Sequence, residues 1–300
     1  MHFTMQIGFL TTVPSLYQPW DLQHLHLPEF FTPEQQAWRE LTYRGFCAQA
    51  TLIVAASQWV KRDLVAQYGL VPDHIAVVNV PPPTAVYRDP TPIETSAIAA
   101  RLGLPDRFVY YPAQTWPHKN HQRLFAALAF LREEGHVVPL VCSGHLNERS
   151  AEIADAASRL GIADQVHFVG YLEPIEIQVL YRTARALVFP SLYEGWGLPI
   201  MEAFSNGLPV ACSDVTSIPE LVGDAALVFD PYDPRSIAAA VQRLWTDDAL
   251  AVELARRGRA VAGRYDWDRT ARIMRAHYRR TAGQILNEAD VALLAHAPTV

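Results

Sequence analysis

Two glutamates, Glu194 and Glu202, stand eight positions apart around a Gly-Trp-Gly turn at residues 195–197. The apolar run at 186–190 before them is typical of a buried parallel strand, and Pro199 suits the first turn of a following helix. Loops at the carboxyl ends of parallel strands form ligand crevices, and a helix start offers unpaired N–H groups to a phosphate. The segment therefore predicts a small-molecule site.

The chemistry of this site depends on the role of Glu202, which we expect in the first turn of the helix. A carboxylate at that position can accept two hydrogen bonds from a vicinal diol, such as that of a ribose or a hexose. The alternative is a glutamate that only caps the helix, which the helix dipole favours.

The elements that must position these residues alternate along the chain. A capping pattern at Thr32 and Gln35 opens a helix, Ser57 caps a second and Gly69 ends it. We expect helices at 32–47, 57–69, 93–102, 249–265 and 267–284, and strands at 51–57, 75–80, 108–112, 137–143, 165–169, 186–190, 208–212 and 226–229. This alternation predicts an α/β protein with a doubly wound parallel sheet. The proline run at 81–83 is the best domain boundary.

Composition is that of an ordinary soluble protein. The chain has 300 residues, of which 50% are hydrophobic, and a net charge of −6, so it can bury one large core or two ordinary ones. No apolar run approaches the roughly 18 residues that a membrane span requires, and the N-terminus lacks the form of a secretory signal. We therefore expect a cytoplasmic protein with buried thiols at Cys47, Cys142 and Cys212, and no nucleic-acid partner.

Basic residues crowd the last fifth of the chain. This cluster can dock on anionic lipid headgroups, which would place the protein peripherally at the inner face of the cell membrane. A solvated helix face with acidic neighbours, Asp266 and Asp268, is the alternative. The arginines are Arg256, Arg257, Arg259, Arg264, Arg269, Arg272, Arg275, Arg279 and Arg280.

The segment at 191–209 resembles the E-x7-E donor-binding signature of retaining glycosyltransferases of the GT-B fold, family four, also called glycosyl transferases group 1. The resemblance runs from about residue 2 to residue 280. It also rests on four further motifs in the family's order: YYPAQTWPHKN at 110–120, HFVGYL at 167–172, GLPVACSD at 207–214 and IPELVGDAALVFDPYDP at 218–234.

This resemblance implies two Rossmann-like domains, of which the C-terminal one is complete and the N-terminal one partial. Residues 1–83 would form the acceptor-side domain, 84–265 the donor-binding domain, 266–284 a terminal helix that returns to the first domain, and 285–300 a weakly structured tail. Residues 19–31 match the latter half of a family N-terminal domain, while its first strands and glycine-rich loop find no match. We expect a truncated or misannotated reading frame; the alternative is a protein that has lost part of its acceptor site.

The resemblance also assigns residues to the donor. Lys119 would stabilise the diphosphate, Glu202 would hold the ribose and Glu194 the donor sugar near the reacting carbon, so that Glu194 and Lys119 are the catalytic pair. Most members carry an arginine where this chain has Gln114. Tyr171 would stack on the base, or pack in the core. The full donor-binding set is Gln114, Lys119, Ser143, Gly144, Gly170, Tyr171, Glu194, Gly195, Trp196, Gly197, Leu198 and Glu202.

On the acceptor side, Trp20 occupies the position where family members often place a histidine that contacts the donor sugar. His24 is the nearest replacement as an acceptor contact, with a purely structural histidine as the alternative. Asp21 is expected to orient this loop.

The activity implied is transfer of a hexose, such as mannose, from a nucleotide-diphosphate sugar to a glycan or lipid-linked acceptor of the cell envelope, with retention of configuration. The sugar nucleotide is a co-substrate; no cofactor and no metal are expected, because the chain lacks a fitting D-x-D loop, an H-E-x-x-H set and a G-x-G-x-x-G turn. The alternatives are a non-catalytic nucleotide-sugar-binding relative and another GT-B chemistry, such as a sugar-nucleotide epimerase or a phosphorylase.

Overall fold

The computed structural model describes residues 1–83, 87–145 and 147–295. The predicted domain start at residue 84 and the end of the predicted tail, 296–300, lie outside the described residues. The chain forms two compact units. Unit 1 comprises Met1–Pro81, Glu194–Gly197 and Tyr265–Val300, and unit 2 comprises Pro82–Tyr193 and Leu198–Arg264.

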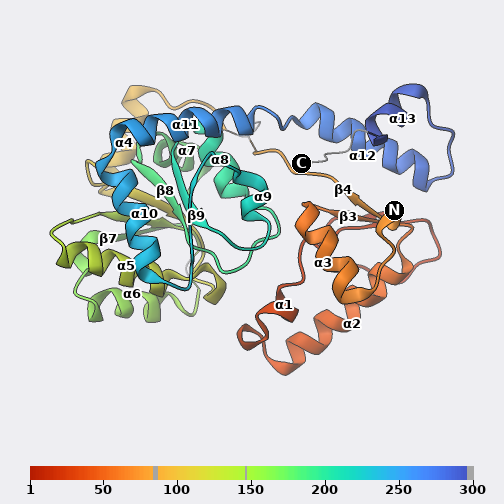
Figure 1. The fold of residues 1–300 in the computed structure, drawn as a ribbon, viewed down its shortest axis with the longest axis horizontal. Coiled ribbons are helices and arrows are strands. Elements are labelled where there is room, and N and C mark those ends of the chain that lie inside the picture. Colours follow the sequence, from red (N-terminus) through yellow and green to blue (C-terminus); the bar gives the residue numbers. More distant parts are fainter. Residues whose placement is uncertain (84–86, 146, 296–300) are drawn as a thin grey trace. The chain divides into compact units, whose positions relative to one another are not determined.

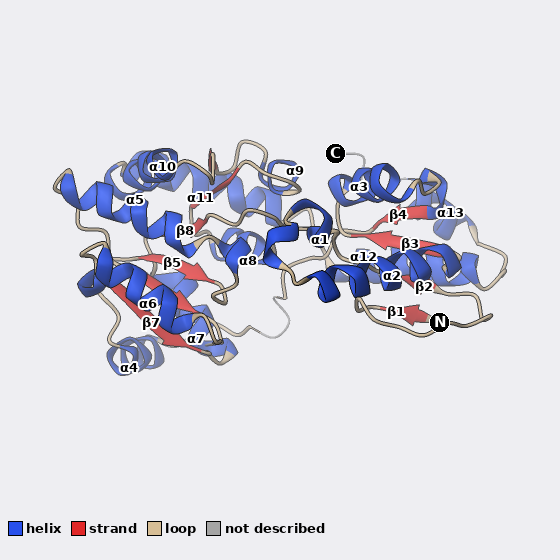
Figure 2. Cartoon of the chain, turned by 90° about the horizontal axis from the view of Figure 1, so that it is seen from below, coloured by secondary structure: helices blue, strands red, loops and turns tan. Residues whose placement is uncertain are grey.

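Unit 1 is built on a four-stranded parallel sheet in the order β1-β2-β3-β4. Figure 1 labels β3 and β4, and Figure 2 labels all four strands. Side chains alternate across the sheet. Tyr17 and Ile53 face a core that includes Tyr43, whereas Leu16 and Val54 share the opposite face with Ile273. The strands are β1 (His2–Phe3), β2 (Leu16–Tyr17), β3 (Leu52–Ala55) and β4 (Ile75–Val77), and the helices are α1 (Gln23–His26), α2 (Pro33–Gln49), α3 (Gln58–Tyr68), α12 (Trp267–Thr281) and α13 (Glu288–Ala295).

The start signals of α2 and α3 act as predicted. Thr32 and Gln35 form a complete capping box at the start of α2. The Ser57 hydroxyl accepts a hydrogen bond from the Val60 amide, and Gly69 ends α3 in the left-handed conformation. The strand β3 and the helix α3 therefore meet at Ser57, which is fully buried.

Unit 2 holds a six-stranded parallel sheet in the order β10-β9-β8-β5-β6-β7, which confirms the doubly wound prediction (Figure 2, strands in red). Its strands are β5 (Val109–Pro112), β6 (Leu140–Ser143), β7 (Val166–Gly170), β8 (Ala186–Phe189), β9 (Val210–Ser213) and β10 (Leu227–Phe229). Its helices are α4 (Pro92–Leu102), α5 (His121–Glu133), α6 (Ser150–Arg159), α7 (Pro174–Thr183), α8 (Leu198–Asn206), α9 (Ile218–Val222), α10 (Pro234–Thr246) and α11 (Asp248–Ala262).

The strand order of unit 2 reverses between β5 and β8, which are hydrogen-bonded neighbours. From β5 the sheet grows outward through β6 and β7, and from β8 it grows the other way through β9 and β10. Ligands of open α/β sheets bind outside the carboxyl ends of the strands at such a reversal. The loops that follow β5 and β8 are therefore the expected ligand site of unit 2.

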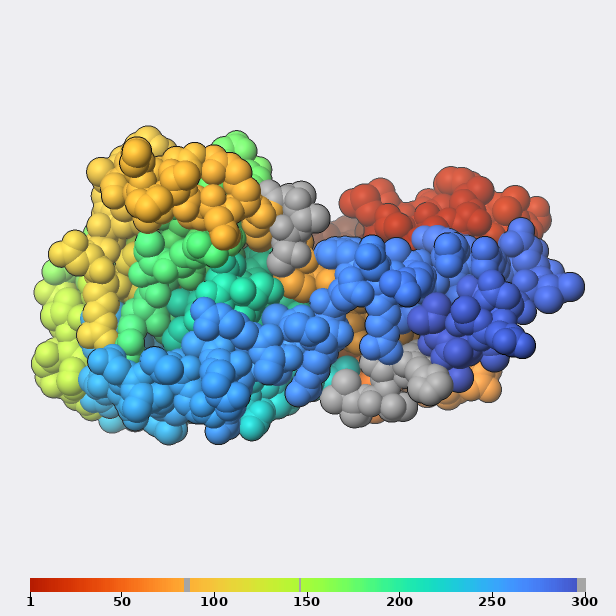
Figure 3. Space-filling model, turned by 90° about the horizontal axis from the view of Figure 1, so that it is seen from above, coloured from red at the N-terminus to blue at the C-terminus, as the bar shows by residue number. Residues whose placement is uncertain are grey.

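Helices cover the outside of each unit. In the space-filling view, α10 and α11 lie in light blue on unit 2, and α12 and α13 in darker blue on unit 1 (Figure 3). The helix α13, Glu288–Ala295, lies within the segment 285–300 that was expected to be weakly structured. All three cysteines are buried free thiols, as predicted. No helix among the described residues is long and apolar enough to cross a membrane.

Candidate active site

Lys119 lies in the loop after β5, at the end of a single helical turn, Pro117–Lys119, that precedes α5. Its ammonium stands 5.5 Å from the centre of the Phe189 ring at the end of β8. The Tyr111 hydroxyl of β5 donates a 2.5 Å hydrogen bond to the Lys119 carbonyl. The two strands on either side of the reversal therefore both position this lysine.

Asn120 ties together the loops around Lys119. It is buried, adopts the left-handed conformation (φ 61°), and its amide nitrogen donates to the carbonyls of Pro190 (3.0 Å) and Pro231 (2.8 Å). These prolines follow β8 and β10, so one side chain fixes three loops at the carboxyl edge. The sequence motif includes Asn120 but does not predict this role. The available signal is an asparagine just before a helix, because asparagine is among the non-glycine residues that most readily adopt the left-handed conformation.

The predicted donor-binding residues at the ends of β6 and β7 come together at the same edge. The Gly144 amide after β6 donates to the Gly170 carbonyl of β7 (2.8 Å), and a Cβ on Gly144 would lie 2.9 Å from the Ala113 carbonyl carbon after β5. Glycine is required at this close approach, where φ is 142°. Ser143 is buried, with its hydroxyl 2.7 Å from that of Tyr110.

The side chains of Tyr171 and Gln114 at this edge each contact another side chain. Tyr171 is 60% exposed and stacks on His145, with ring centres 4.4 Å apart, so the core-packing alternative for this tyrosine is wrong. The Gln114 side-chain oxygen accepts a 2.7 Å hydrogen bond from the Trp116 indole, which leaves its amide group as a donor.

The prediction that Glu202 lies in the first turn of its helix is wrong. The helix α8 begins at Leu198, which places Glu202 in the second turn. A helix-capping role is therefore excluded. The Tyr181 hydroxyl donates to Oε2 at 2.5 Å, and the Tyr87 hydroxyl donates to Oε1 at 2.9 Å. Burial raises the pKa of the Glu202 carboxyl above its ordinary value, against the opposing effect of the two phenols.

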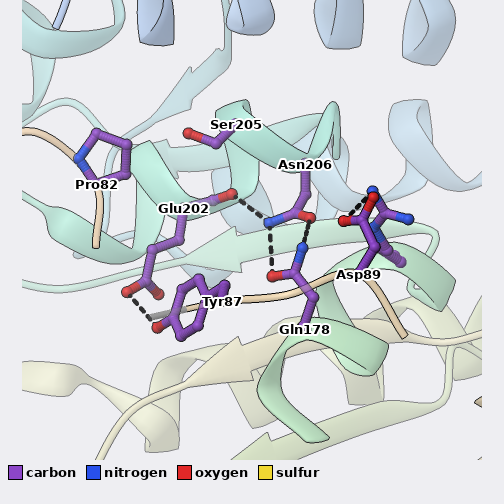
Figure 4. Close-up of a pocket in the computed structure, with 8 residues that line it drawn as sticks. Pro82, Tyr87, Asp89, Gln178, Glu202, Ser205 and Asn206 are labelled. Carbon is purple, nitrogen blue, oxygen red and sulfur yellow. Dashed lines mark hydrogen bonds and ion pairs between the residues drawn. The ribbon is translucent and has the colours of Figure 1, made fainter. Parts of the chain in front are cut away.

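A polar cavity of about 170 Å³ adjoins Glu202 (Figure 4). Across it, the side chains of Gln178 and Asn206 are hydrogen-bonded to each other, and Arg182 forms an ion pair with Asp89 at 2.8 Å. The cavity is lined by Pro82, Tyr87, Asp89, Gln178, Arg182, Glu202, Ser205 and Asn206.

The first glutamate of the signature belongs to unit 1, in the segment Glu194–Gly197. The buried Ser57 hydroxyl donates to the Gly195 carbonyl (3.0 Å), and the Trp196 indole donates to the Val80 carbonyl (2.8 Å). A Cβ on Gly195 would lie 2.5 Å from the Trp20 carbonyl oxygen. The signature is thus divided, with Glu194 counted in unit 1 and Leu198 and Glu202 in unit 2.

The acceptor-side candidates lie in unit 1. Asp21 orients its loop, because its carboxylate accepts from the Gln23 amide at 3.0 Å. His24 has a side chain only 1% exposed, lies 3.4 Å from the Glu40 carboxylate and contacts Tyr43 edge-on, which favours the structural alternative. Burial lowers its pKa.

The arginine cluster is divided in the same way. Arg256 and Arg257 of α11 in unit 2 form ion pairs with Glu253, whereas Arg279 of α12 in unit 1 pairs with Asp290. Arg269, Arg272 and Arg275 lie on the exposed side of α12. Within the described ranges, no group of three or more histidines, cysteines or acidic residues is placed to hold a metal ion.

The family described as "Glycosyl transferases group 1" matches residues 95–261. The O-antigen chain mannosyltransferase B of Escherichia coli is 30% identical over 250 residues, which cover 83% of this chain and 65% of that protein. The chain therefore spans less than two thirds of the length of this curated relative.

Solved structures of similar fold cover more of the chain. Sucrose-phosphate synthase from Thermosynechococcus elongatus superposes with a TM-score of 0.76 at 22% identity, over 90% of this chain and 68% of that one. HepE from Anabaena, in complex with UDP and glucose, superposes with a TM-score of 0.71 at 22% identity, over 84% of this chain and 67% of that one.

Proposed function

Because this chain belongs to the glycosyl transferases of group 1 and has the GT-B fold, we propose that it moves a hexose from a nucleotide-diphosphate sugar to a glycan or lipid-linked acceptor. One observation carries the proposal. Lys119, Ser143–Gly144 and Gly170–Tyr171 lie at the carboxyl ends of β5, β6 and β7, the three strands on one side of the strand reversal. That edge offers a cation and an exposed aromatic ring to a nucleoside diphosphate.

In the proposed reaction, the bond from the anomeric carbon to the diphosphate breaks through an oxocarbenium-like transition state. The acceptor oxygen bonds to the same face of that carbon, and its proton passes to the departing phosphate, so configuration is retained. Lys119 stabilises the charge that develops on the diphosphate, and Glu194 holds hydroxyls of the donor sugar. Positioning and electrostatics then supply the catalysis, without a nucleophilic carboxylate and without a metal ion.

The finer identity of the substrates is part of the proposal. The name of the Escherichia coli relative supports mannose as the sugar and a cell-envelope polysaccharide as the acceptor. The UDP in HepE supports a nucleoside diphosphate as the donor's leaving group. The exposed arginines of α12 suit a peripheral cytoplasmic contact with a membrane that carries the acceptor.

The decisive experiment is a calorimetric titration of the 300-residue chain with UDP, GDP and ADP, without added metal, beside the Glu202→Ala variant. We expect one nucleotide to bind, and the variant to bind it about tenfold or more weakly while remaining folded. The matching sugar nucleotide is then tested for transfer. Binding without transfer would favour the non-catalytic relative, and failure of all three nucleotides to bind would contradict the donor site.

A further inference from the structure

Glu202 is held by two tyrosines that come from different segments of unit 2. Tyr181 lies on α7, 21 positions before Glu202, and Tyr87 lies before α4, 115 positions before it. We propose that Tyr181 and Tyr87 are positioning residues, which fix the Glu202 carboxylate and present its remaining lone pairs to the hydroxyls of the donor's ribose. The inference rests on the proposed function of this site.

The Tyr181 hydroxyl is rigidly placed. The residue is buried, its hydroxyl lies 2.5 Å from Oε2 of Glu202 and 3.4 Å from the Pro199 carbonyl, and its ring meets that of Tyr110 edge-on at 5.2 Å. Tyr110 in turn reaches the Ser143 hydroxyl at 2.7 Å. A continuous set of contacts therefore joins Glu202 to the end of β6.

Tyr87 completes the arrangement from the other oxygen. Its hydroxyl and the carboxylate of Glu202 point toward each other at 2.9 Å (Figure 4). An ionised carboxylate can accept about four hydrogen bonds, two on each oxygen. The tyrosines occupy one acceptor position on each oxygen, which leaves one on each oxygen for the two hydroxyls of a vicinal diol.

The tyrosines also favour the charged form of the carboxylate. Burial raises the pKa of Glu202, and the two phenol hydrogen bonds oppose this by favouring the charged form. Burial raises the pKa of Tyr87 and of Tyr181 as well, so both remain protonated donors at neutral pH. The other charged groups that line the adjoining cavity, Asp89 and Arg182, are paired with each other.

A carbon-13 NMR titration of the Glu202 carboxyl tests the electrostatic part without a ligand. Tyr181→Phe removes one donor and keeps the ring, so we expect the midpoint of the titration to rise by about 1 pH unit. Tyr87→Phe should act in the same direction. An unchanged midpoint in both variants would overturn the proposal.

Nucleotide titrations from pH 5 to 8 test the functional part. For whichever of UDP, GDP or ADP binds, we expect each Tyr→Phe variant to bind about tenfold more weakly at neutral pH. As the pH falls, each variant should also lose affinity at a higher pH than the unmodified chain does. The 2′,3′-dideoxy form of that nucleotide lacks the diol, and its affinity should not respond to either substitution.

Tyr68→Phe is the matched control, because the Tyr68 hydroxyl also donates to a glutamate, Oε2 of Glu40 at 3.1 Å, but within unit 1. It should leave nucleotide affinity unchanged. If no nucleotide binds the unmodified chain, the proposed function fails. If a nucleotide binds and the Tyr181 and Tyr87 variants bind it equally well, this inference alone fails.

Discussion

Gly195 is the residue at which backbone geometry most constrains the site. Its position for a Cβ lies 2.5 Å from the Trp20 carbonyl oxygen and 3.6 Å from the Asp21 Cβ. Contacts under 3.0 Å do not occur for real Cβ atoms, so any side chain must push this backbone away. The glycine therefore fixes the segment Glu194–Gly197 against the loop of Trp20.

We predict that Gly195→Ala lowers the free energy of unfolding of unit 1 by about 1–3 kcal/mol, because the added methyl overlaps a backbone atom. Gly45→Ala is the control. Gly45 lies within α2 with nothing within 4 Å of its Cβ position, so alanine should raise the stability by up to about 1 kcal/mol. Urea unfolding measures both. Equal effects of the two substitutions would contradict the steric argument.

At this scale, the sequence names candidate site residues but does not show which side chains hold them in place. Glu194, Lys119 and Glu202 stand out because their motifs are local. The partners of Glu202 do not, because Tyr181 and Tyr87 reach it only after the chain has folded. The left-handed conformation of Trp20 (φ 67°) likewise could not be predicted from the sequence, because tryptophan has no preference for that conformation.

At the scale of elements, Ser57 does two tasks at the junction of β3 and α3. Its hydroxyl accepts from the Val60 amide as a helix cap and donates to the Gly195 carbonyl. Thr32, at the start of α2, caps its helix near the surface and is exposed. The two positions therefore separate the capping effect from the additional hydrogen bond.

We predict that Thr32→Ala lowers the free energy of unfolding by about 1 kcal/mol, the usual loss for a cap. Ser57→Ala should cost about 2–3 kcal/mol, because it also leaves the Gly195 carbonyl without this donor. Urea unfolding followed by circular dichroism compares the two variants. A loss for Ser57→Ala no greater than that for Thr32→Ala would contradict the second role.

Most elements could be predicted because apolar runs and caps are local signals. The sequence predicts the starts of β6 and β9 too early, at 137 and 208, because Pro139 and Pro209 delay the strands to Leu140 and Val210. It does not predict strands β1 and β2, because two residues each are too few for a pattern. Helix α13 gave weak signals and forms against α12.

At the scale of the whole molecule, buried histidines govern the response to acid. Burial lowers the pKa of His121 in unit 2 to about 3 and that of His277 in unit 1 to about 4. Below about pH 6.5 the unfolded chain takes up these protons while the folded chain does not. Folding stability is therefore full above pH 6.5 and is lost as the pH falls toward the folded values.

We predict that His121 alone removes about 2 kcal/mol of stability between pH 7 and pH 5. His121→Phe keeps an aromatic ring between Tyr111 and Phe125 and should flatten this dependence by about one proton, whereas His74→Gln, at an exposed histidine, is the control. Glu202, whose pKa is raised, changes the stability with pH in the opposite direction. This effect is the same in the unmodified chain and in both variants, so it cancels in the comparison. Urea unfolding at each pH measures the difference, and parallel curves for His121→Phe and the unmodified chain would refute it.

The chain passes between the two units four times, at 81–82, 193–194, 197–198 and 264–265. Unit 2 is thus an insertion within unit 1 that returns a four-residue piece, Glu194–Gly197, to its host. A gene fusion that exchanges unit 2 between related proteins has to transplant those four codons with the insert, although their packing partners, such as Ser57 and Val80, stay in the recipient. Whether Glu194–Gly197 of the insert packs against the unit 1 of the recipient then determines which pairs of units can recombine into a folded protein.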